Sequence, residues 1–219
     1  MMCNTSFIVT QVYTSKRSMP ASPLPALTGA IGCGRRFSYK GLGEPLCFFA
    51  FGPSATSAFY LSMLPAAAAG AAAAASTAAI TPLVWTVALC VGITTTIILF
   101  CSHFHQIEGD TAAGKRSPLV RLGTERAVPI LKAATLLPYA ALAAVTVAQA
   151  SGLAPWLGIP YTLLPATLLS VPAAAAMLSF ADANHRVPAQ IAPLKIYATK
   201  LHMAFGMSLV LGLVASRWV

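Results

Sequence analysis

The residues best able to do chemistry lie in one short stretch, HFHQIEGDTAAGKRSPLVRLG, at positions 103–123. It holds Glu108 and Asp110, two of only five carboxylates in the 219-residue chain, followed by Lys115, Arg116 and Arg121. Mg²⁺ prefers oxygen ligands and is usually held by one or two carboxylates together with substrate phosphates. Lys and Arg side chains bind the other phosphate oxygens, and Arg often does so through two parallel hydrogen bonds. The residues alone therefore indicate either a Mg²⁺–diphosphate site or a solvated loop with incidental ion pairs.

Other candidate ligands give weaker signals. His103 and His105 could bind a metal, but their i, i+2 spacing does not place them on one helix face, and no third nitrogen or sulfur ligand is close. Packing or a hydrogen bond at a membrane interface is the favoured interpretation. The five cysteines have no CxxC spacing, which is typical of small buried hydrophobic residues rather than a zinc site or a disulfide framework.

The composition indicates an integral membrane protein. The chain is 57% hydrophobic and only 9% charged, and its mean hydropathy is +0.74. Soluble domains carry roughly a quarter charged residues, so this chain could not cover its surface in water. The net charge of +9 follows from basic residues that border membrane spans. No stripe of basic and aromatic residues points to a nucleic-acid partner.

Helical spans must position the charged stretch. A helix needs about 20 apolar residues to cross the hydrocarbon core. Five stretches qualify, which predicts an all-α membrane bundle of about five transmembrane helices, at residues 46–64, 82–104, 128–150, 158–180 and 196–216. Gly52-Pro53 predicts a kink in the first span, and the alanine-rich residues 65–80 predict a loop or a helix extension.

The charged residues fall on one side of this arrangement. The connections at 65–81 and 151–157 carry no charge, whereas 35–44, 105–127 and 181–195 contain all five carboxylates. Lys132 and Lys200 lie one turn inside their spans at the same side. The positive-inside rule explains the basic residues but not the carboxylates. A polar mouth on one end of the bundle is the more economical interpretation, and it disfavours a transporter or channel, for which charges within the spans would be expected.

Residues 1–34 differ from the rest of the chain. They are rich in Ser and Thr, and no acidic residue occurs before Glu44. This composition is typical of a transit-like segment or a disordered tail, or of a start foreign to the native protein. We therefore expect the transmembrane domain to comprise residues 35–219.

Three stretches carry a resemblance to a known family. FHQIEGDTAAGKRSPLVRLG, at 104–123, closely resembles the second acidic motif of the UbiA-type intramembrane prenyltransferases. FSYKGLGEPLCFFAFGP, at 37–53, and KLHMAFGMSLVLGL, at 200–213, resemble the same family. The match is closest to the MenA-like 1,4-dihydroxy-2-naphthoate branch, and within it to the phytyl-transferring enzymes of plants, algae and cyanobacteria.

The resemblance implies the C-terminal part of a nine-helix membrane fold. Members of the family bind a prenyl diphosphate through Mg²⁺, ionise it to an allylic cation and let an electron-rich ring capture that cation. For this branch the resemblance implies transfer of a prenyl group, phytyl in particular, to 1,4-dihydroxy-2-naphthoate in phylloquinone or menaquinone biosynthesis. It also implies a plastid membrane as the location and membrane lipid as a partner.

Site residues carry over by position. The resemblance implies that Mg²⁺ is held by Asp110, with Glu108 and Gln106 as further ligands. The expected substrate-binding residues are all basic: Lys115, Arg116, Arg121 and Lys200. Tyr39 and Lys40 are the expected catalytic residues, because a phenol ring can support a cation through its face and a lysine can hold phosphate or the aromatic acid.

One family feature does not occur. The first acidic motif, N-x-x-x-D-x-x-x-D, is absent from the sequence. This departure leaves two interpretations open. The chain is either a prenyltransferase represented by its C-terminal portion, or a truncated, non-catalytic membrane protein of the same family.

Overall fold

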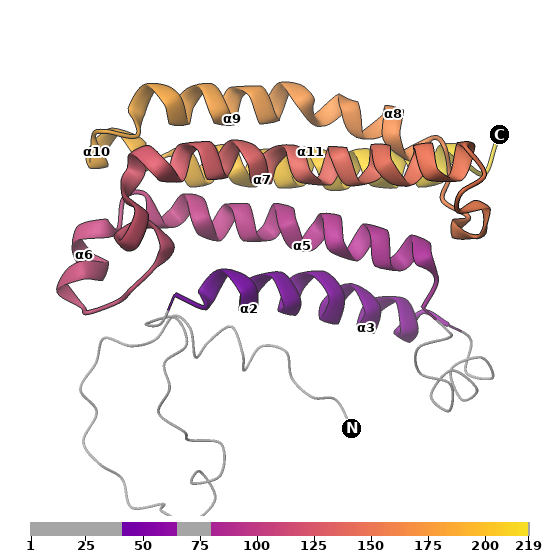
Figure 1. Ribbon diagram of the computed structural model, residues 1–219, viewed down its shortest axis with the longest axis horizontal. Coiled ribbons are helices and arrows are strands. Elements are labelled where there is room, and N and C mark those ends of the chain that lie inside the picture. The colour runs from indigo at the N-terminus through magenta and orange to yellow at the C-terminus, as the bar shows by residue number, and fades with distance from the viewer. Residues whose placement is uncertain (1–40, 65–79, 219) are drawn as a thin grey trace, which may run out of the picture.

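The computed structural model describes residues 41–64 and 80–218, and these residues form helices and no strands (Figure 1). Three of the helical segments, α2, η2 and α3, follow one another without interruption. The segments in chain order are α2 (Gly43–Phe49), η2 (Ala50–Ser54), α3 (Ala55–Ser62), α5 (Pro82–His103), α6 (Ile107–Ala112), α7 (Pro118–Ala150), η3 (Pro155–Leu157), α8 (Leu163–Thr167), η4 (Leu168–Ser170), α9 (Val171–Asn184), α10 (Pro188–Ile191) and α11 (Leu194–Ala215). The predicted all-α membrane bundle is confirmed.

Four helical runs in the described residues are long and apolar enough to cross a membrane: Pro82–His103, Pro118–Ala150, Leu163–Asn184 and Pro188–Ala215. The predicted count of about five is therefore one too high by this criterion. The predicted first span is continuous helix from Gly43 to Ser62, but a π-helical turn containing Pro53 divides it where a kink was predicted.

Two predicted boundaries were wrong. The fourth span begins at Leu163 rather than 158, because Pro155–Leu157 forms a separate 3₁₀ turn. The third begins at Pro118 rather than 128, and a non-helical Gly123, with φ 72° and ψ 166°, breaks its first turns. Charged residues made 118–127 look like a loop, but Pro is well suited to the first position of a helix and the break is confined to one glycine.

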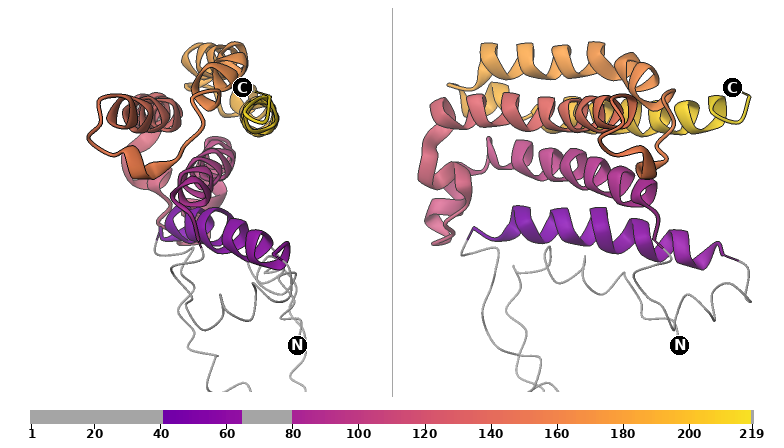
Figure 2. Two further views of the ribbon diagram at one scale, coloured as in Figure 1. Left: turned by 90° about the vertical axis from the view of Figure 1, so that its right-hand side faces the viewer. Right: turned by 45° about the vertical axis from the view of Figure 1, so that its right-hand side comes forward.

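Helix α5 occupies the centre of the bundle. Segments α2 to α3 pack along one side of it, and α7 and α11 pack on the others; α8 and α9 in turn pack on α11 (Figures 1 and 2). Many large apolar side chains face outward, including Leu136 (61% exposed), Leu169 (68%) and Val210 (53%). Lipid is the surrounding in which so much exposed apolar surface is stable.

A glycine pair sets the closest helix contact. A Cβ added to Gly52 would lie 2.7 Å from the Ala88 carbonyl oxygen and 2.8 Å from Gly92 Cα, and one added to Gly92 would meet Phe48 and Gly52 at 2.9–3.0 Å. Small residues let helix backbones approach closely, and this approach drives much of helix association in lipid. The glycine pair therefore fixes the α2–η2 segment against α5.

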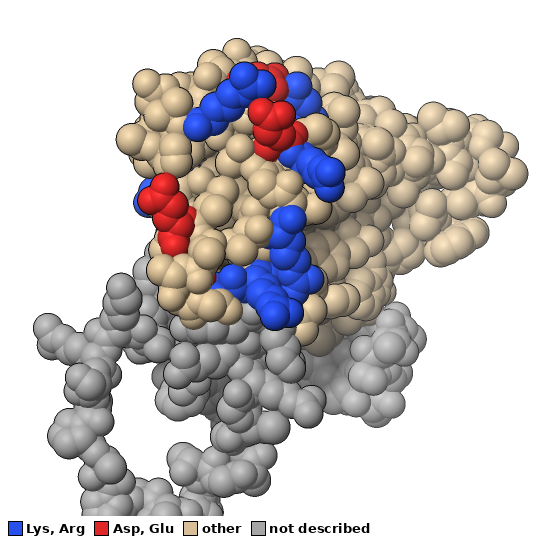
Figure 3. All heavy atoms as spheres, turned by 60° about the vertical axis from the view of Figure 1, so that its left-hand side comes forward, with Lys and Arg blue, Asp and Glu red and all other residues tan. Residues whose placement is uncertain are grey.

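The two ends of the bundle differ in chemistry. The start of α2, the α5–α7 connection and the α9–α11 connection all lie at one end, and every carboxylate of the chain lies in these segments or in the adjoining parts of α7 and α9 (Figures 1 and 3). We call this the charged end. The opposite end carries all three tryptophans, Trp85, Trp156 and Trp218, each at least 41% exposed. Trp prefers the membrane–water interface, so the two ends mark the two faces of the membrane.

Substitution of Gly52 by Ala should lower the free energy of unfolding by about 1–3 kcal/mol, because the added methyl group collides with backbone rather than with a movable side chain. Reversible unfolding in mixed micelles measures this change. Gly206→Ala is the matched control, because a Cβ there meets nothing within 4 Å. Equal stability of the Gly52→Ala and Gly206→Ala chains would contradict the packing described.

Fluorescence quenching tests the position of the tryptophans. In bilayers that contain brominated lipids, bromines near the headgroups should quench emission more strongly than bromines at the acyl-chain ends, because all three indoles lie at one end. The Trp156→Phe chain should give less emission with the same depth profile. Strongest quenching by deep bromines would show that this end is not interfacial.

Candidate functional site

Helix α6 and its flanking turns form the α5–α7 connection. Gly114, at φ 69°, follows the C-cap residue Ala113 and ends α6, as glycine commonly does at this position. Ser117 and Pro118 then begin α7, with Pro118 in its first turn. The short helix is thereby fixed against the end of the bundle, and it carries two of the predicted metal ligands.

Asp110 is the buried carboxylate of this connection. Its side chain is 5% exposed, and Oδ1 accepts a hydrogen bond from Lys115 Nζ at 3.0 Å. The Lys115 backbone N–H also donates to the Asp110 carbonyl oxygen at 2.8 Å. Asp110 Oδ2 is buried and has no hydrogen-bond partner in the described part of the chain. The predicted proximity of Asp110 and Lys115 is thus present, and one carboxylate oxygen is left for a ligand.

Glu108 and Gln106 occupy different surroundings from Asp110. Glu108 is exposed, whereas Asp110, two residues further along the same helix, is buried. Residues at i and i+2 of a helix do not face each other. Gln106 is partly exposed, with Nε2 3.5 Å from His105 Nε2. Among the described residues no three His, Cys, Asp or Glu side chains form a metal-binding group, so Asp110 is the one predicted carboxylate ligand that points inward.

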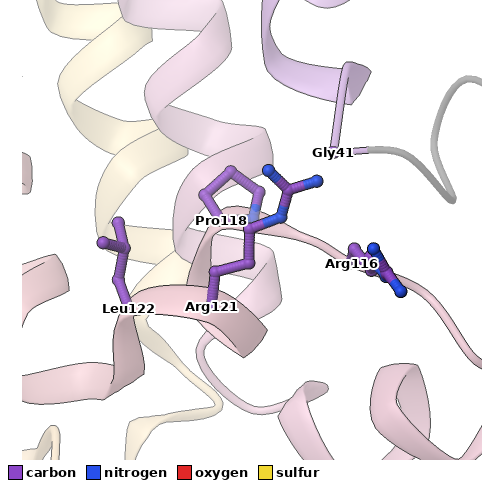
Figure 4. A pocket seen from close by; sticks show the side chains of 5 residues that line it. All are labelled: Gly41, Arg116, Pro118, Arg121 and Leu122. Carbon is purple, nitrogen blue, oxygen red and sulfur yellow. The ribbon is translucent and has the colours of Figure 1, made fainter.

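Two arginines line a cavity beside this connection. The cavity has a volume of about 260 Å³ and is lined by Gly41, Arg116, Pro118, Arg121 and Leu122 (Figure 4). Gly41 has φ +75°, and a Cβ there would lie 2.4 Å from the Arg116 carbonyl oxygen and 3.3 Å from Arg121 Nη2. Glycine is therefore required where the chain enters α2. Tyr39 and Lys40 lie outside the described residues, directly before this glycine in the sequence.

A second contact joins α2 to the end of α5. Glu44 in the first turn of α2 is buried, and its Oε1 lies 3.0 Å from His103 Nδ1. The interpretation of His103 as a hydrogen-bonding residue at the membrane interface fits this contact. Its partner, 59 positions away in the sequence, was not predicted. The start of α2 therefore contacts both ends of the α5–α7 connection, through Glu44 at the His103 end and through Gly41 at the Arg116 end.

Lys200 does not line the cavity. It is exposed on α11, and Nζ lies 5.5 Å from the centre of the Tyr197 ring, one turn earlier on the same helix face. Tyr197 in turn stacks on Phe180 of α9 at 4.6 Å. A lysine over an aromatic ring is held by a cation–π interaction, and the substrate-binding role of Lys200 stays a prediction.

Two further ion pairs cross the charged end. Lys132 Nζ lies 2.8 Å from Asp182 Oδ1, and Arg186 Nη2 lies 3.2 Å from Glu125 Oε1. Both pairs join the first half of α7 to the end of α9 or to the turn that follows it. They are largely exposed, so each contributes about 0–1 kcal/mol at most. Of the carboxylates, Asp110 and Glu44 alone are buried.

Fold and site together define the class: an all-α membrane protein whose charged end holds both a buried carboxylate and a cavity lined by two arginines. Comparison with known proteins gives the family. The chain is 39% identical over 213 residues to the chloroplastic 2-carboxy-1,4-naphthoquinone phytyltransferase of Arabidopsis thaliana, matching 94% of this chain and 52% of the relative. It is 38% identical over 177 residues to the 2-carboxy-1,4-naphthoquinone phytyltransferase of Synechocystis, matching 81% of this chain and 50% of the relative.

These identities confirm the resemblance indicated by the motifs. Over most of its own length, the chain is similar to naphthoquinone phytyltransferases, the branch of the UbiA-type prenyltransferases that the motifs indicated. It spans about half the length of either relative. No protein-family model matches the chain, and no solved structure matches it.

The electrostatics of the connection can be tested at His105. Burial, followed by the charges of Lys195 and His103, lowers the pKa of His105, and the Asp110 carboxylate acts in the opposite direction. The imidazole is therefore neutral at pH 7. Lys195→Gln should raise this pKa, and Asp110→Asn should lower it further; histidine ¹⁵N NMR titration measures both. Lys132→Gln is the control, and shifts of the same sign for Lys195→Gln and Asp110→Asn would contradict the arrangement.

Proposed function

We propose that this chain provides the diphosphate-binding end of a prenyltransferase. The donor is a prenyl diphosphate, phytyl diphosphate in particular, and the acceptor is 1,4-dihydroxy-2-naphthoate in phylloquinone or menaquinone biosynthesis. The observation that carries the proposal is that the buried Asp110 and the cavity lined by Arg116 and Arg121 both lie at the charged end of a chain similar to phytyltransferases. A plastid membrane is the proposed location, because the Arabidopsis relative is named chloroplastic.

The residues present fit Mg²⁺. Asp110 Oδ2 is buried without a partner in the described residues, and a single carboxylate with substrate phosphates is a common way to hold this ion. Asp110 would be the inward ligand, and Glu108 and Gln106 would complete the set directly or through water. When bound, Mg²⁺ supplies positive charge that stabilises the diphosphate as a leaving group.

The basic residues bind the rest of the diphosphate. Arg116 and Arg121 line the same cavity and offer planar donors that match phosphate oxygens. Lys115 already holds one oxygen of Asp110 and is placed to bridge that carboxylate and a phosphate. Charge that develops on the departing diphosphate would be stabilised by these fixed cations, in line with the general importance of preorganised charge in catalysis.

The acceptor must be an electron-rich ring, because it captures an allylic cation. The relatives are named for the quinone form, 2-carboxy-1,4-naphthoquinone. The resemblance implies the reduced form, 1,4-dihydroxy-2-naphthoate, and we propose the reduced form because its two hydroxyl groups donate electron density to the ring. Tyr39 and Lys40, next in sequence to the cavity residue Gly41, are the proposed groups that support the cation and hold the acceptor carboxylate.

A non-catalytic membrane protein is the second candidate. It is favoured by the absence of the first acidic motif, which in the family supplies further metal ligands. Such a protein would bind a prenyl lipid or a partner without turnover. Activity measurements separate the two candidates.

The test uses the full 219-residue chain in lipid nanodiscs, alone and together with the part of the Arabidopsis relative that it does not match. With phytyl diphosphate and Mg²⁺, we expect diphosphate release and a prenylated product from 1,4-dihydroxy-2-naphthoate but not from the quinone form. Asp110→Asn and Arg121→Met should each lower the rate by about a hundredfold or more, because each removes a fixed charge that stabilises the leaving group.

Glu125→Gln is the matched control, since Glu125 is an exposed carboxylate of the same end whose observed ion-pair partner is Arg186. It should leave the rate unchanged. Absence of product under both conditions would overturn the proposal in favour of the non-catalytic candidate. Full activity of the Asp110→Asn chain would refute the metal role, and turnover of the quinone form would refute the choice of acceptor.

A further inference from the structure

His202 lies deep in a membrane span. It is eight residues past Leu194, the start of α11, which places it about 12 Å along the helix from the charged end. Ionisable side chains within spans are uncommon and usually functional. His202 is not among the residues that line the arginine cavity, so the proposed site does not account for it.

Thr94 of α5 fixes the imidazole. Thr94 is buried, and its Oγ1 lies 2.9 Å from His202 Nδ1. The same hydroxyl donates to the Val91 and Cys90 carbonyl oxygens at 3.0 and 3.2 Å. Because its one proton is directed to the backbone, Thr94 favours the tautomer in which Nδ1–H donates to Oγ1. That tautomer leaves Nε2 as a hydrogen-bond acceptor.

The adjacent threonines behave differently. Thr95 and Thr96 each donate to a carbonyl of their own helix at 2.8 Å, and each hydroxyl thereby satisfies its donor locally. Of the three, Thr94 is the one whose hydroxyl reaches α11, whereas Thr96 lies against Cys47 of α2. His202 Nε2 has no hydrogen-bond partner within the described residues and is not among their buried unpartnered atoms, so it is accessible from outside the packed core.

The surface of α11 near His202 is apolar and partly open. Gly206 is one turn after His202 on the same helix, and a Cβ added there would meet nothing within 4 Å. We call this open space at Gly206 the notch. Met203 and Met207 lie on the adjoining part of the helix, and both are more than half exposed. Methionine side chains adapt to the shape of a bound apolar group. An acceptor atom and an adaptable apolar surface thus lie within about one turn of the same helix.

We infer that His202, held by Thr94, binds a hydroxyl group of a neutral naphthohydroquinone, the class of product that the proposed reaction releases. The inference rests on the proposed function. A hydroxyl donor satisfies Nε2, and an uncharged ring with an apolar tail suits this depth. The acceptor substrate carries a carboxylate, which is strongly disfavoured within hydrocarbon. When the prenyl cation has been added to the ring and the carboxylate has left as CO₂, the product is uncharged and can occupy a position that excludes the substrate.

The test follows the four histidines of the chain by ¹⁵N NMR in nanodiscs. The probe is 2-methyl-1,4-naphthohydroquinone, kept reduced with dithionite under nitrogen. We expect the probe to shift the His202 Nε2 resonance. The oxidised 2-methyl-1,4-naphthoquinone, which has the same ring but no hydroxyl donor, should bind about fivefold more weakly or less well still. The anion 1,4-dihydroxy-2-naphthoate should leave the His202 Nε2 resonance unchanged.

Matched variants locate the site. Gly206→Leu fills the notch and Thr94→Val releases the imidazole, so both should weaken probe binding at least about fivefold. Thr95→Val is the control and should bind as the unchanged chain does. Circular dichroism reports whether each variant is folded. Equal affinity for the quinone and the hydroquinone, or unchanged binding by a folded Gly206→Leu chain, would overturn the inference.

The outcome is separable from that of the proposed function. Asp110→Asn should abolish transfer and leave hydroquinone binding intact, because Asp110 lies in the connection at the charged end and His202 within the span. If Gly206→Leu weakens hydroquinone binding but the unchanged chain shows no transferase activity, the proposed function alone would be refuted. If the chain is an active transferase but the Gly206→Leu and Thr94→Val variants bind the hydroquinone as well as the unchanged chain does, the inference alone would be refuted.

Discussion

The free-energy cost of placing charge in hydrocarbon organises this molecule. A charged side chain at mid-membrane is disfavoured by at least about 2.5–3.5 kcal/mol on insertion scales. Of the charged residues that the structure describes, all except Arg217 lie at or within two helical turns of one end. Gathered there, they pair with one another, as in Lys115–Asp110, Lys132–Asp182 and Arg186–Glu125. Segregation from lipid thus produces a concentrated polar surface, which is a precondition for binding a diphosphate.

The same constraint acts on uncharged polar groups within the spans. Thr86, Thr135 and Thr146 each donate to a carbonyl four residues earlier in their own helix. Such bonds satisfy the hydroxyl without specifying a neighbour. Other bonds join different helices, among them Tyr139 with Ser170, Thr162 with the Gly212 carbonyl, and Thr94 with His202. Together with the Gly52–Gly92 approach, they select which helices meet, because apolar contact alone does not distinguish a helix from lipid.

Three features could be predicted because each depends on local sequence. The long apolar runs predict the spans, the proline at Gly52-Pro53 predicts the interruption, and the alternation of successive spans predicts that the charges lie on one side. Pairings could not be predicted. Glu44 and His103, or Gly41 and Arg121, are brought together by folding of segments far apart in sequence. Glu108 and Asp110 illustrate the difference. Their closeness in the motif predicts that both hold the same metal ion, but helix α6 turns Glu108 outward and Asp110 inward.

Charge also gives the proposed reaction a direction in space. The donor diphosphate and the acceptor carboxylate are both anions, so their binding is confined to the charged end, where Lys115, Arg116 and Arg121 lie. In the proposed transfer the prenyl cation would be added to the ring and the carboxylate would leave as CO₂, so that an anionic diphosphate separates from an uncharged ring. The arginines would retain the diphosphate. The uncharged product would no longer be held at the charged end and would dissolve in the lipid that surrounds α5 and α11. A polar atom within that depth, such as His202 Nε2, would then interact with product more favourably than with either substrate.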